Sequence, residues 1–322
     1  MHPLRPLVIA FALALTILAA PAVALDYPAR TVRIVAPYPP GGSVDVLARI
    51  IAQWLSDKMG QQFMVENKPG GGNNIGTEAV VNAAPDGYTM LLVNPANGIN
   101  ATLYQNLPFN FIRDIAPVAG LVRTPNVMEV TNSLPVKTVA EFIAYCKANP
   151  GKINMASSGS GTSVHLSGEL FKSMTGCDMV HVPYKGAGPA LTDLIAGQVH
   201  VIFDNLPSSA GQIRAGTIRG IAVTSAEREP SFPGLPSIGE TVPGYEATAW
   251  FGLGMPKGTP REIIDKINAE VNRALADPTM RARLAELGGK PLAGTPEDFG
   301  KVIAAETEKW APIVKSSGAK VE

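Results

Sequence analysis

Short apolar runs rich in β-branched residues alternate with helical patterns along most of this chain of 322 residues. A strand, a helix and a second strand in succession favour a parallel sheet with helices on its faces. The pattern therefore predicts an α/β fold of mostly parallel sheets flanked by helices. The predicted strands lie at 32–36, 62–66, 89–93, 153–156, 179–182, 199–203, 218–223 and 248–254, and helical periodicity marks 44–59, 74–84, 163–174 and 187–196.

Three threonines mark further helix starts, because each stands three positions before an acidic residue in the pattern of a capping box. They are Thr138, Thr259 and Thr295, and a proline suited to the first helical position follows Thr259. The helix after Thr295 is predicted at 296–316, where it ends the fold. We expect Trp310, within this last helix, to be a buried core residue.

The first 24 residues have the features of a secretory signal. Arg5 gives a positive start, 7–20 is apolar, and 22–24 has the small-x-small form of a cleavage site. The apolar run is shorter than the ~20 residues that a membrane-spanning helix needs. We therefore expect cleavage near Ala24 and export to the periplasm, with a retained N-terminal anchor as the alternative.

The charge of the chain is balanced, with 27 basic and 27 acidic residues, and loss of the signal would remove only Arg5. This balance argues against nucleic-acid binding, which usually needs a basic excess or patch. No G-x-G-x-x-G follows a strand and no P-loop is present, so we expect no nucleotide cofactor. The cysteines and histidines lack zinc-binding spacing, so we expect no metal. The length suffices for two lobes with cores of their own.

The two cysteines are Cys146 and Cys177. An exported protein can keep a disulfide, but the sequence does not show whether these residues meet. Two buried, unpaired thiols are the favoured interpretation, and a disulfide stays open.

The segment 37–45 joins a β-branched strand to a helix through a loop rich in proline and glycine. Such a junction points free backbone N–H groups and a helix N-terminus at one place, which suits an anion. Within it, Tyr38, Gly41 and Gly42 form the loop, and Ser43 is placed to cap the helix. Because the residues do not suit a nucleotide, we predict a site for a small anion such as a carboxylate.

A second junction of this kind lies at 157–163, between a predicted strand and a predicted helix. It contains Ser158 and Gly161, and Thr162 is the expected N-cap. The alternative is a tight turn with ordinary capping. Two such junctions in separate parts of the chain favour a binding cleft between them. No G-x-S-x-G elbow surrounds either loop serine, so a nucleophile is not indicated.

Three more side chains follow predicted strands, where ligands of open α/β sheets are bound. Asn97 lies in an amide-rich turn after the strand at 89–93, and its alternative role is turn capping. Asp204 follows 199–203 and either holds a ligand amine or hydroxyl or caps the next helix. Lys185 either attracts an anion or is simply solvated.

Several motifs in order resemble one family over nearly the whole mature chain. The chain is similar to the periplasmic solute receptors of tripartite tricarboxylate transporters, often called the Bug family. No single motif decides this, but their order and spacing are specific. They are Tyr27-Pro-Ala-Arg30, Pro37-Tyr-Pro-Pro-Gly-Gly-Ser-Val-Asp45, Asn67-Lys-Pro-Gly-Gly-Gly72, Pro85-Asp-Gly-Tyr-Thr89, Gly159-Ser-Gly-Thr162 with His165, Val182-Pro-Tyr-Lys-Gly186, Gly197-Gln-Val199, Phe203-Asp204, Ala222-Val-Thr-Ser225 and Lys309-Trp310.

The resemblance implies a two-lobed type II periplasmic binding protein of the Venus flytrap kind. After the signal at 1–24, it implies a first lobe of 25–124 and 250–322 and a second lobe of 125–249. It also implies a small organic acid, such as a dicarboxylate, an amino acid or an aromatic acid, bound between the two anion loops. The partners would be a large and a small membrane permease subunit, and the receptor a monomer. The ligand-binding residues expected are Tyr38, Gly41, Gly42, Ser43, Asn97, Ser158, Gly161, Thr162 and Asp204.

Two other functions remain open at this point. One is an exported sensor subunit that reports ligand occupancy to a histidine kinase. The other is an exported hydrolase of a small ester or amide, which would need a nucleophile–base pair or a metal set.

Overall fold

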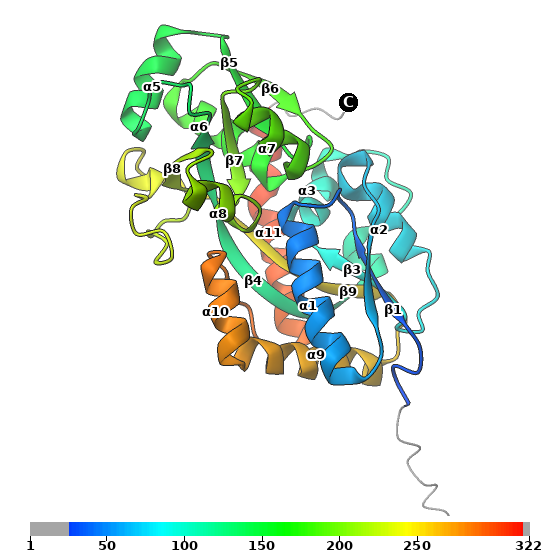
Figure 1. Ribbon diagram of the computed structural model, residues 1–322. Helices are drawn as coiled ribbons and strands as arrows, with labels where there is room; N and C mark the ends of the chain where they lie inside the picture. Colours follow the sequence, from blue (N-terminus) through cyan, green and yellow to red (C-terminus); the bar gives the residue numbers. More distant parts are fainter. Residues whose placement is uncertain (1–25, 318–322) are drawn as a thin grey trace, which may run out of the picture.

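The computed structural model describes residues 26–317, so the predicted signal segment lies outside the described residues. Two groups of elements, here called the first and second lobes, lie one below the other and are joined by one long curved strand (Figure 1). No helix of the described part is long and apolar enough to cross a membrane.

The first lobe has parallel strands at its edge, in the order β2-β1-β3, followed by the antiparallel strand β9. Helices cover both of its faces (Figure 1). Its strands are β1 (Val32–Ala36), β2 (Phe63–Asn67), β3 (Thr89–Val93), β9 (Thr248–Pro256) and β10 (Lys290–Pro291). Its helices are α1 (Ser43–Met59), η1 (Gly71–Asn73), α2 (Asn74–Val81), α3 (Pro95–Leu103), α4 (Phe111–Asp114), α9 (Arg261–Ala276), α10 (Pro278–Glu286) and α11 (Pro296–Ser317).

The second lobe repeats this plan, because parallel pairing joins β6 to β5 and β5 to β7. Its strands are β5 (Ile153–Ser157), β6 (Met179–Pro183), β7 (Val201–Asn205) and β8 (Arg219–Val223). Its helices are α5 (Val139–Ala148), α6 (Ser163–Thr175), α7 (Ala187–Ile195), α8 (Leu206–Ala215) and η2 (Ile238–Glu240).

Strand β4 (Ile115–Val130) belongs to both lobes. It pairs antiparallel with β9 as far as Pro125, and from Asn126 onward it pairs antiparallel with β7 and β8. The expectation of mostly parallel sheets therefore needs correction, because parallel pairing holds within each lobe while the strands that carry the chain between lobes run antiparallel. The predicted lobe boundary lies beside this change of partner and stays a prediction.

Each lobe has its own apolar core. In the first lobe the core includes Ile34 of β1, Leu55 of α1 and Ile267 of α9, all with 4% exposure or less. The core of the second lobe holds both cysteines, which are buried and form no disulfide. The favoured interpretation of two buried thiols is therefore confirmed.

Trp310 of α11 is buried, as the sequence predicts, and it packs between the two lobes. Its cluster contains Ile99 and Leu103 from α3 of the first lobe and Leu166 from α6 of the second. The last helix is therefore a second connection between the lobes beside β4.

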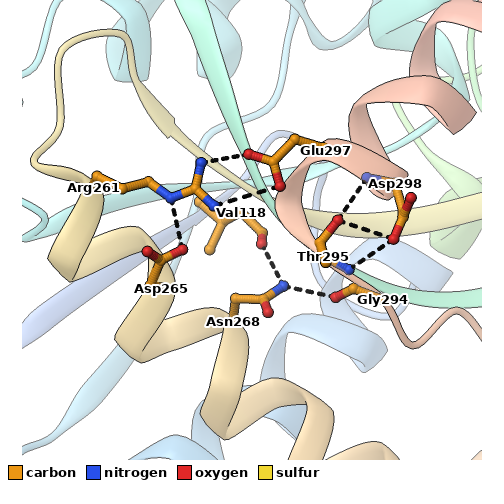
Figure 2. A network of polar contacts seen from close by, with 8 residues as sticks. All are labelled: Val118, Arg261, Asp265, Asn268, Gly294, Thr295, Glu297 and Asp298. Atoms are coloured by element: carbon orange, nitrogen blue, oxygen red, sulfur yellow. Dashed lines mark hydrogen bonds and ion pairs between the residues drawn. The ribbon is translucent and has the colours of Figure 1, made fainter.

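The three predicted capping boxes have different outcomes. Thr138 caps α5 by accepting from the Glu141 N–H at 3.1 Å. Thr295 is confirmed in full, because its Oγ accepts from the Asp298 N–H at 3.1 Å while the Asp298 carboxylate accepts from the Thr295 N–H at 3.2 Å (Figure 2).

The prediction for Thr259 is wrong. Its hydroxyl donates backward to the Pro256 carbonyl at 2.8 Å, and α9 begins at Arg261 with Pro260 as its N-cap and no side-chain cap. Instead, Arg261 pairs with Asp265 at 2.7 Å and with Glu297 of α11, which ties the two helices together (Figure 2).

Candidate functional site

An inner pocket lies between the two lobes, with about 370 Å³ of empty space that includes open solvent. Both predicted anion loops contribute to its wall. Among the described residues, no charged side chain lines it. The lining residues are Tyr38, Gly42, Ser43, Val44, Asn94, Pro95, Ser158, Ser163, Ala187, Asn205 and Phe251.

Five helices of the described chain begin at this pocket. Each follows directly on a strand, so that β1, β3, β5, β6 and β7 lead into α1, α3, α6, α7 and α8. Residues at or beside the first position of each helix line the pocket. Because the first N–H groups of a helix have no partner within it and carry partial positive charge, the pocket favours an anion without any basic side chain.

The first loop is held in shape by a buried carboxylate. Asp45 accepts from the Gly41 N–H at 3.1 Å, pairs with Arg49 at 2.8 Å and accepts from Asn67 at 2.9 Å. The Asn67 amide also donates to the Tyr38 carbonyl at 2.9 Å. Burial opposes the charge of Asp45, but the hydrogen bonds from Arg49, Asn67 and Gly41 outweigh it and lower its pKa. The loop is therefore fixed before any ligand arrives.

Ser43 does not cap α1, contrary to prediction. The N-cap is Gly42, with extended backbone and no side-chain hydrogen bond, and Ser43 is the first helical residue. Its hydroxyl instead lies 3.2 Å from the Asn205 carbonyl and 3.1 Å from Ser208 Oγ, both in the second lobe. Ser43 therefore links the lobes across the pocket.

The second loop is capped as predicted. Thr162 Oγ accepts from the His165 N–H at 3.2 Å, and the same hydroxyl donates to the Gly159 carbonyl at 2.8 Å. The Gly161 N–H donates to His165 Nδ1 at 3.2 Å, so this N–H is already used. The positive φ of 80° at Gly161 turns the loop into the helix.

Two stacked histidines support the second loop from behind. The rings of His165 and His181 lie 3.8 Å apart, and His181 Nε2 lies 2.6 Å from Ser157 Oγ. Burial lowers the pKa of His165 to about 3, with help from His181 and Lys172, and lowers the pKa of His181 to about 4. Ser157 is fully buried and His181 is half-buried, and neither residue lines the inner pocket.

An outer cavity continues the cleft, with about 940 Å³ of empty space that includes open solvent. Tyr38 and Ser158 line both spaces and so mark their junction. Burial raises the pKa of both Tyr38 and Tyr104, so the two phenols keep their protons. The outer cavity is lined by Tyr38, Gly70, Gly71, Gly72, Asn73, Tyr104, Ser158, Gly159, Ser160, Pro183, Tyr184 and Lys185.

The structure brings four of the nine predicted ligand residues to the pocket wall: Tyr38, Gly42, Ser43 and Ser158. The other five, Gly41, Asn97, Gly161, Thr162 and Asp204, are not among the residues that line it. Asn97 joins a capping box of α3, because its Oδ1 accepts from the Asn94 N–H at 2.9 Å and its amide donates to Thr77 at 2.8 Å.

Asp204 is fully buried and is not among the residues that line the inner pocket. One of its oxygens accepts from Ser208, and the other has no partner among the described residues. Glu129 of β4 is similar: one of its oxygens accepts from Ser209, and the other has no partner among the described residues. Burial raises the pKa of Asp204 to about 7, and burial together with Asp204 raises that of Glu129.

Several lining residues were not predicted, among them Asn94, Ser163, Ala187, Asn205 and Phe251. Most of them stand at the carboxyl end of a strand that is parallel to its neighbour, where ligands of open α/β sheets bind. That rule, applied to every predicted strand, would have found the starts of α7 and α8. Phe251 lies in the middle of β9 and carries no such signal.

The comparisons with known proteins agree on one family. Residues 47–319 match the model of the tripartite tricarboxylate transporter family receptor. The chain belongs to this receptor family. The receptor is 37% identical over 308 residues to the protein BugT of Bordetella pertussis (strain Tohama I), covering 95% of this chain and 94% of that protein. The family resemblance stated from the motifs is therefore confirmed.

Two solved structures with ligands are similar to the receptor. One is Rpa4515 of R. palustris with adipate, at 40% identity and a TM-score of 0.90, over 91% of this chain and 99% of that one. The other is MatC (Rpa3494) of Rhodopseudomonas palustris with bound malate, at 32% identity and a TM-score of 0.84, over 89% and 100%. These likenesses confirm the two-lobed α/β binding-protein fold.

Proposed function

We propose that this receptor captures a small organic carboxylate in its inner pocket, in the periplasm, and delivers it to a tripartite tricarboxylate-type membrane permease. One observation carries the proposal: an uncharged pocket into which five helix starts point. The neighbours named with adipate and with malate support a carboxylate as the ligand. The predicted signal supports export, and the family supports a permease as the partner.

The carboxylate would contact both lobes and hold them together. The starts of α1 and α3 come from the first lobe, and those of α6, α7 and α8 from the second. A ligand that contacts both sets gains these contacts only when the cleft is closed, so it stabilises the closed form. The permease then distinguishes the closed receptor from the open one. In this proposal the lobes keep the predicted boundaries of 25–124 with 250–322, and 125–249.

The ligand leaves unchanged in this proposal. Neither Ser157, which is fully buried, nor His181 lines the inner pocket or the outer cavity, which argues against the hydrolase alternative. Nothing in the described residues favours a sensor over a transport receptor, and the two share the same ligand chemistry.

The test is a thermal-shift screen of the purified mature protein with monocarboxylates and dicarboxylates, followed by calorimetric titration of each hit. A ligand that binds the folded protein raises the melting temperature by an amount set by its excess over the Kd. Neutral amides of the same acids serve as matched controls and should give no shift. The proposal fails if no carboxylate shifts the melting temperature, or if a bound acid is consumed during long incubation.

A further inference from the structure

The cleft contains one charged side chain. Among the described residues that line the inner pocket and the outer cavity, Lys185 alone carries a charge, and no carboxylate lines either space. The positive charge therefore stands at the outer end of the cleft, while the helix starts serve the inner end.

Lys185 is not engaged elsewhere. It is exposed, and no ion pair or side-chain hydrogen bond joins its ammonium to another residue of 26–317. The acid on the following helix is already occupied, because Asp193 accepts from the Tyr184 hydroxyl at 2.6 Å. An unpaired ammonium at a cavity wall is free to bind an anion.

The outer cavity is built from both lobes, as the inner pocket is. Gly70 to Gly72 and Tyr104 come from the first lobe, and Ser160 and Lys185 from the second. Gly72 lets the lobes approach closely here, because a Cβ on it would stand 2.4 Å from Tyr104 Oη and 3.3 Å from the Ser160 carbonyl. The phenols of Tyr38 and Tyr104 add two neutral donors between the inner pocket and Lys185.

We propose that the outer cavity is a subsite for the second carboxylate of an extended dicarboxylate, and that Lys185 holds this group. The inference rests on the proposed function, because the first carboxylate is taken to occupy the inner pocket. Lys185 then determines specificity between dicarboxylates and monocarboxylates. A ligand too short to reach from the helix starts past Tyr38 loses this contact.

The experiment compares α,ω-dicarboxylates of four to eight carbons with the monocarboxylates of equal length by calorimetric titration at pH 7.5. The proteins are wild type, Lys185→Met, Lys185→Arg and the control Lys152→Met. Lys152 is an exposed lysine of the same lobe that lines neither cavity. Because Lys185 is exposed and unpaired, its replacement should leave the melting temperature of the free protein unchanged.

We expect wild type to bind its best dicarboxylate about tenfold or more tightly than the matched monocarboxylate, as a charge-assisted hydrogen bond allows. Lys185→Met should abolish this preference while monocarboxylate affinity changes less than about twofold. Lys185→Arg and Lys152→Met should keep the preference.

The inference is overturned if wild type does not prefer dicarboxylates, or if Lys185→Met retains the preference. It is also overturned if Lys185→Met weakens both classes equally, because Lys185 would then support the inner pocket. In each of these cases a bound monocarboxylate leaves the proposed function standing. If wild type binds neither class, the proposed function itself fails.

Discussion

Ala187 is the first residue of α7, and its methyl group lies on the wall of the inner pocket. It packs directly beside the start of α1, because a Cβ on Gly42 would stand 3.6 Å from the Ala187 Cβ. A side chain at this position therefore meets whatever occupies the pocket. It also stands in the first turn of a helix, where an acidic residue is well tolerated.

At the residue scale, Ala187→Asp should remove carboxylate binding more completely than Ala187→Asn. The two side chains have nearly the same size, so their difference reports charge. A negative charge a few ångströms from a bound carboxylate should cost on the order of 1–3 kcal/mol, which is about 5-fold to 150-fold in Kd. Titration of both variants with the best ligand checks this. Equal affinities would show that the pocket does not hold an anion beside α7.

Ser43 and Thr162 show how far a local pattern predicts a residue. Both were expected to cap a helix, and Thr162 does so. Ser43 lies one position inside α1, because Gly42 already has the extended backbone of an N-cap. A shift of one residue turns a local cap into a contact with Ser208 of the other lobe. No local pattern contains that partner, so the sequence did not predict it.

At the scale of elements, β4 was the largest omission of the sequence analysis, which placed only a lobe boundary between 124 and 125. The strand contains Pro117 and Pro125, and prolines argue against an interior strand. Its pairing tolerates them because the register shifts between Pro117 and Ala119, and because the partner changes after Pro125. The strand–helix units of each lobe were predictable, because their periodicity is local.

Because β4 was not predicted, neither was the pairing of Glu129 with Asp204. Both carboxyls point to the same face of the sheet, since Val127 pairs with Asp204 and Glu129 follows two residues later. Each has one unpartnered buried oxygen. Burial raises the pKa of both carboxyls, and Asp204 raises that of Glu129 further, so we predict that the two groups share a proton.

This pair predicts a pH dependence of stability. The pKa of Asp204 is about 7 in the folded protein, against about 3.9 in an unfolded chain. Between these values the folded state holds a proton that the unfolded state releases, so the free energy of unfolding falls as the pH rises from about 4 through 7. In Glu129→Gln, a neutral amide can donate to Asp204. The fall in the free energy of unfolding with rising pH should therefore be smaller in this variant.

Urea unfolding at pH 5, 6, 7 and 8 checks the prediction. Wild type should lose on the order of 1–2 kcal/mol more than Glu129→Gln over this range. The lowered pKa values of His165 and His181 act in the opposite sense below pH 6.5, equally in both proteins, and cancel in the comparison. Glu308→Gln, at an exposed glutamate, is the control and should follow wild type. Parallel profiles for wild type and Glu129→Gln would contradict the shared proton.

At the scale of the whole molecule, the lobes touch through backbone and small residues beside the pocket. Ser43 reaches Asn205, and Pro39 packs on Gly186 so closely that a Cβ there would stand 2.8 Å from Pro39 Cδ. The φ of Gly186 is 165°, which an alanine can adopt. A methyl group at Gly186 therefore obstructs the approach of the lobes and little else.

Gly186→Ala should weaken ligand binding without unfolding either lobe. Overpacking usually costs about 1–3 kcal/mol, so the affinity should fall about tenfold, while the melting temperature of the free protein changes little. Gly211→Ala is the matched control, because a Cβ at Gly211 meets nothing within 4 Å. Calorimetric titration and small-angle scattering with and without ligand check both variants. Wild-type affinity in Gly186→Ala would mean that binding does not need this contact between lobes.

The helix starts at the inner pocket have a consequence for how such a receptor can change during evolution. Their N–H groups belong to the backbone, and no substitution except proline removes them. The grip on one carboxylate is therefore inherited with the fold, whatever the neighbouring side chains become. Positions such as 185 and 187 are then free to vary. A change of ligand requires different side chains on the cavity wall and not a different site for the carboxylate.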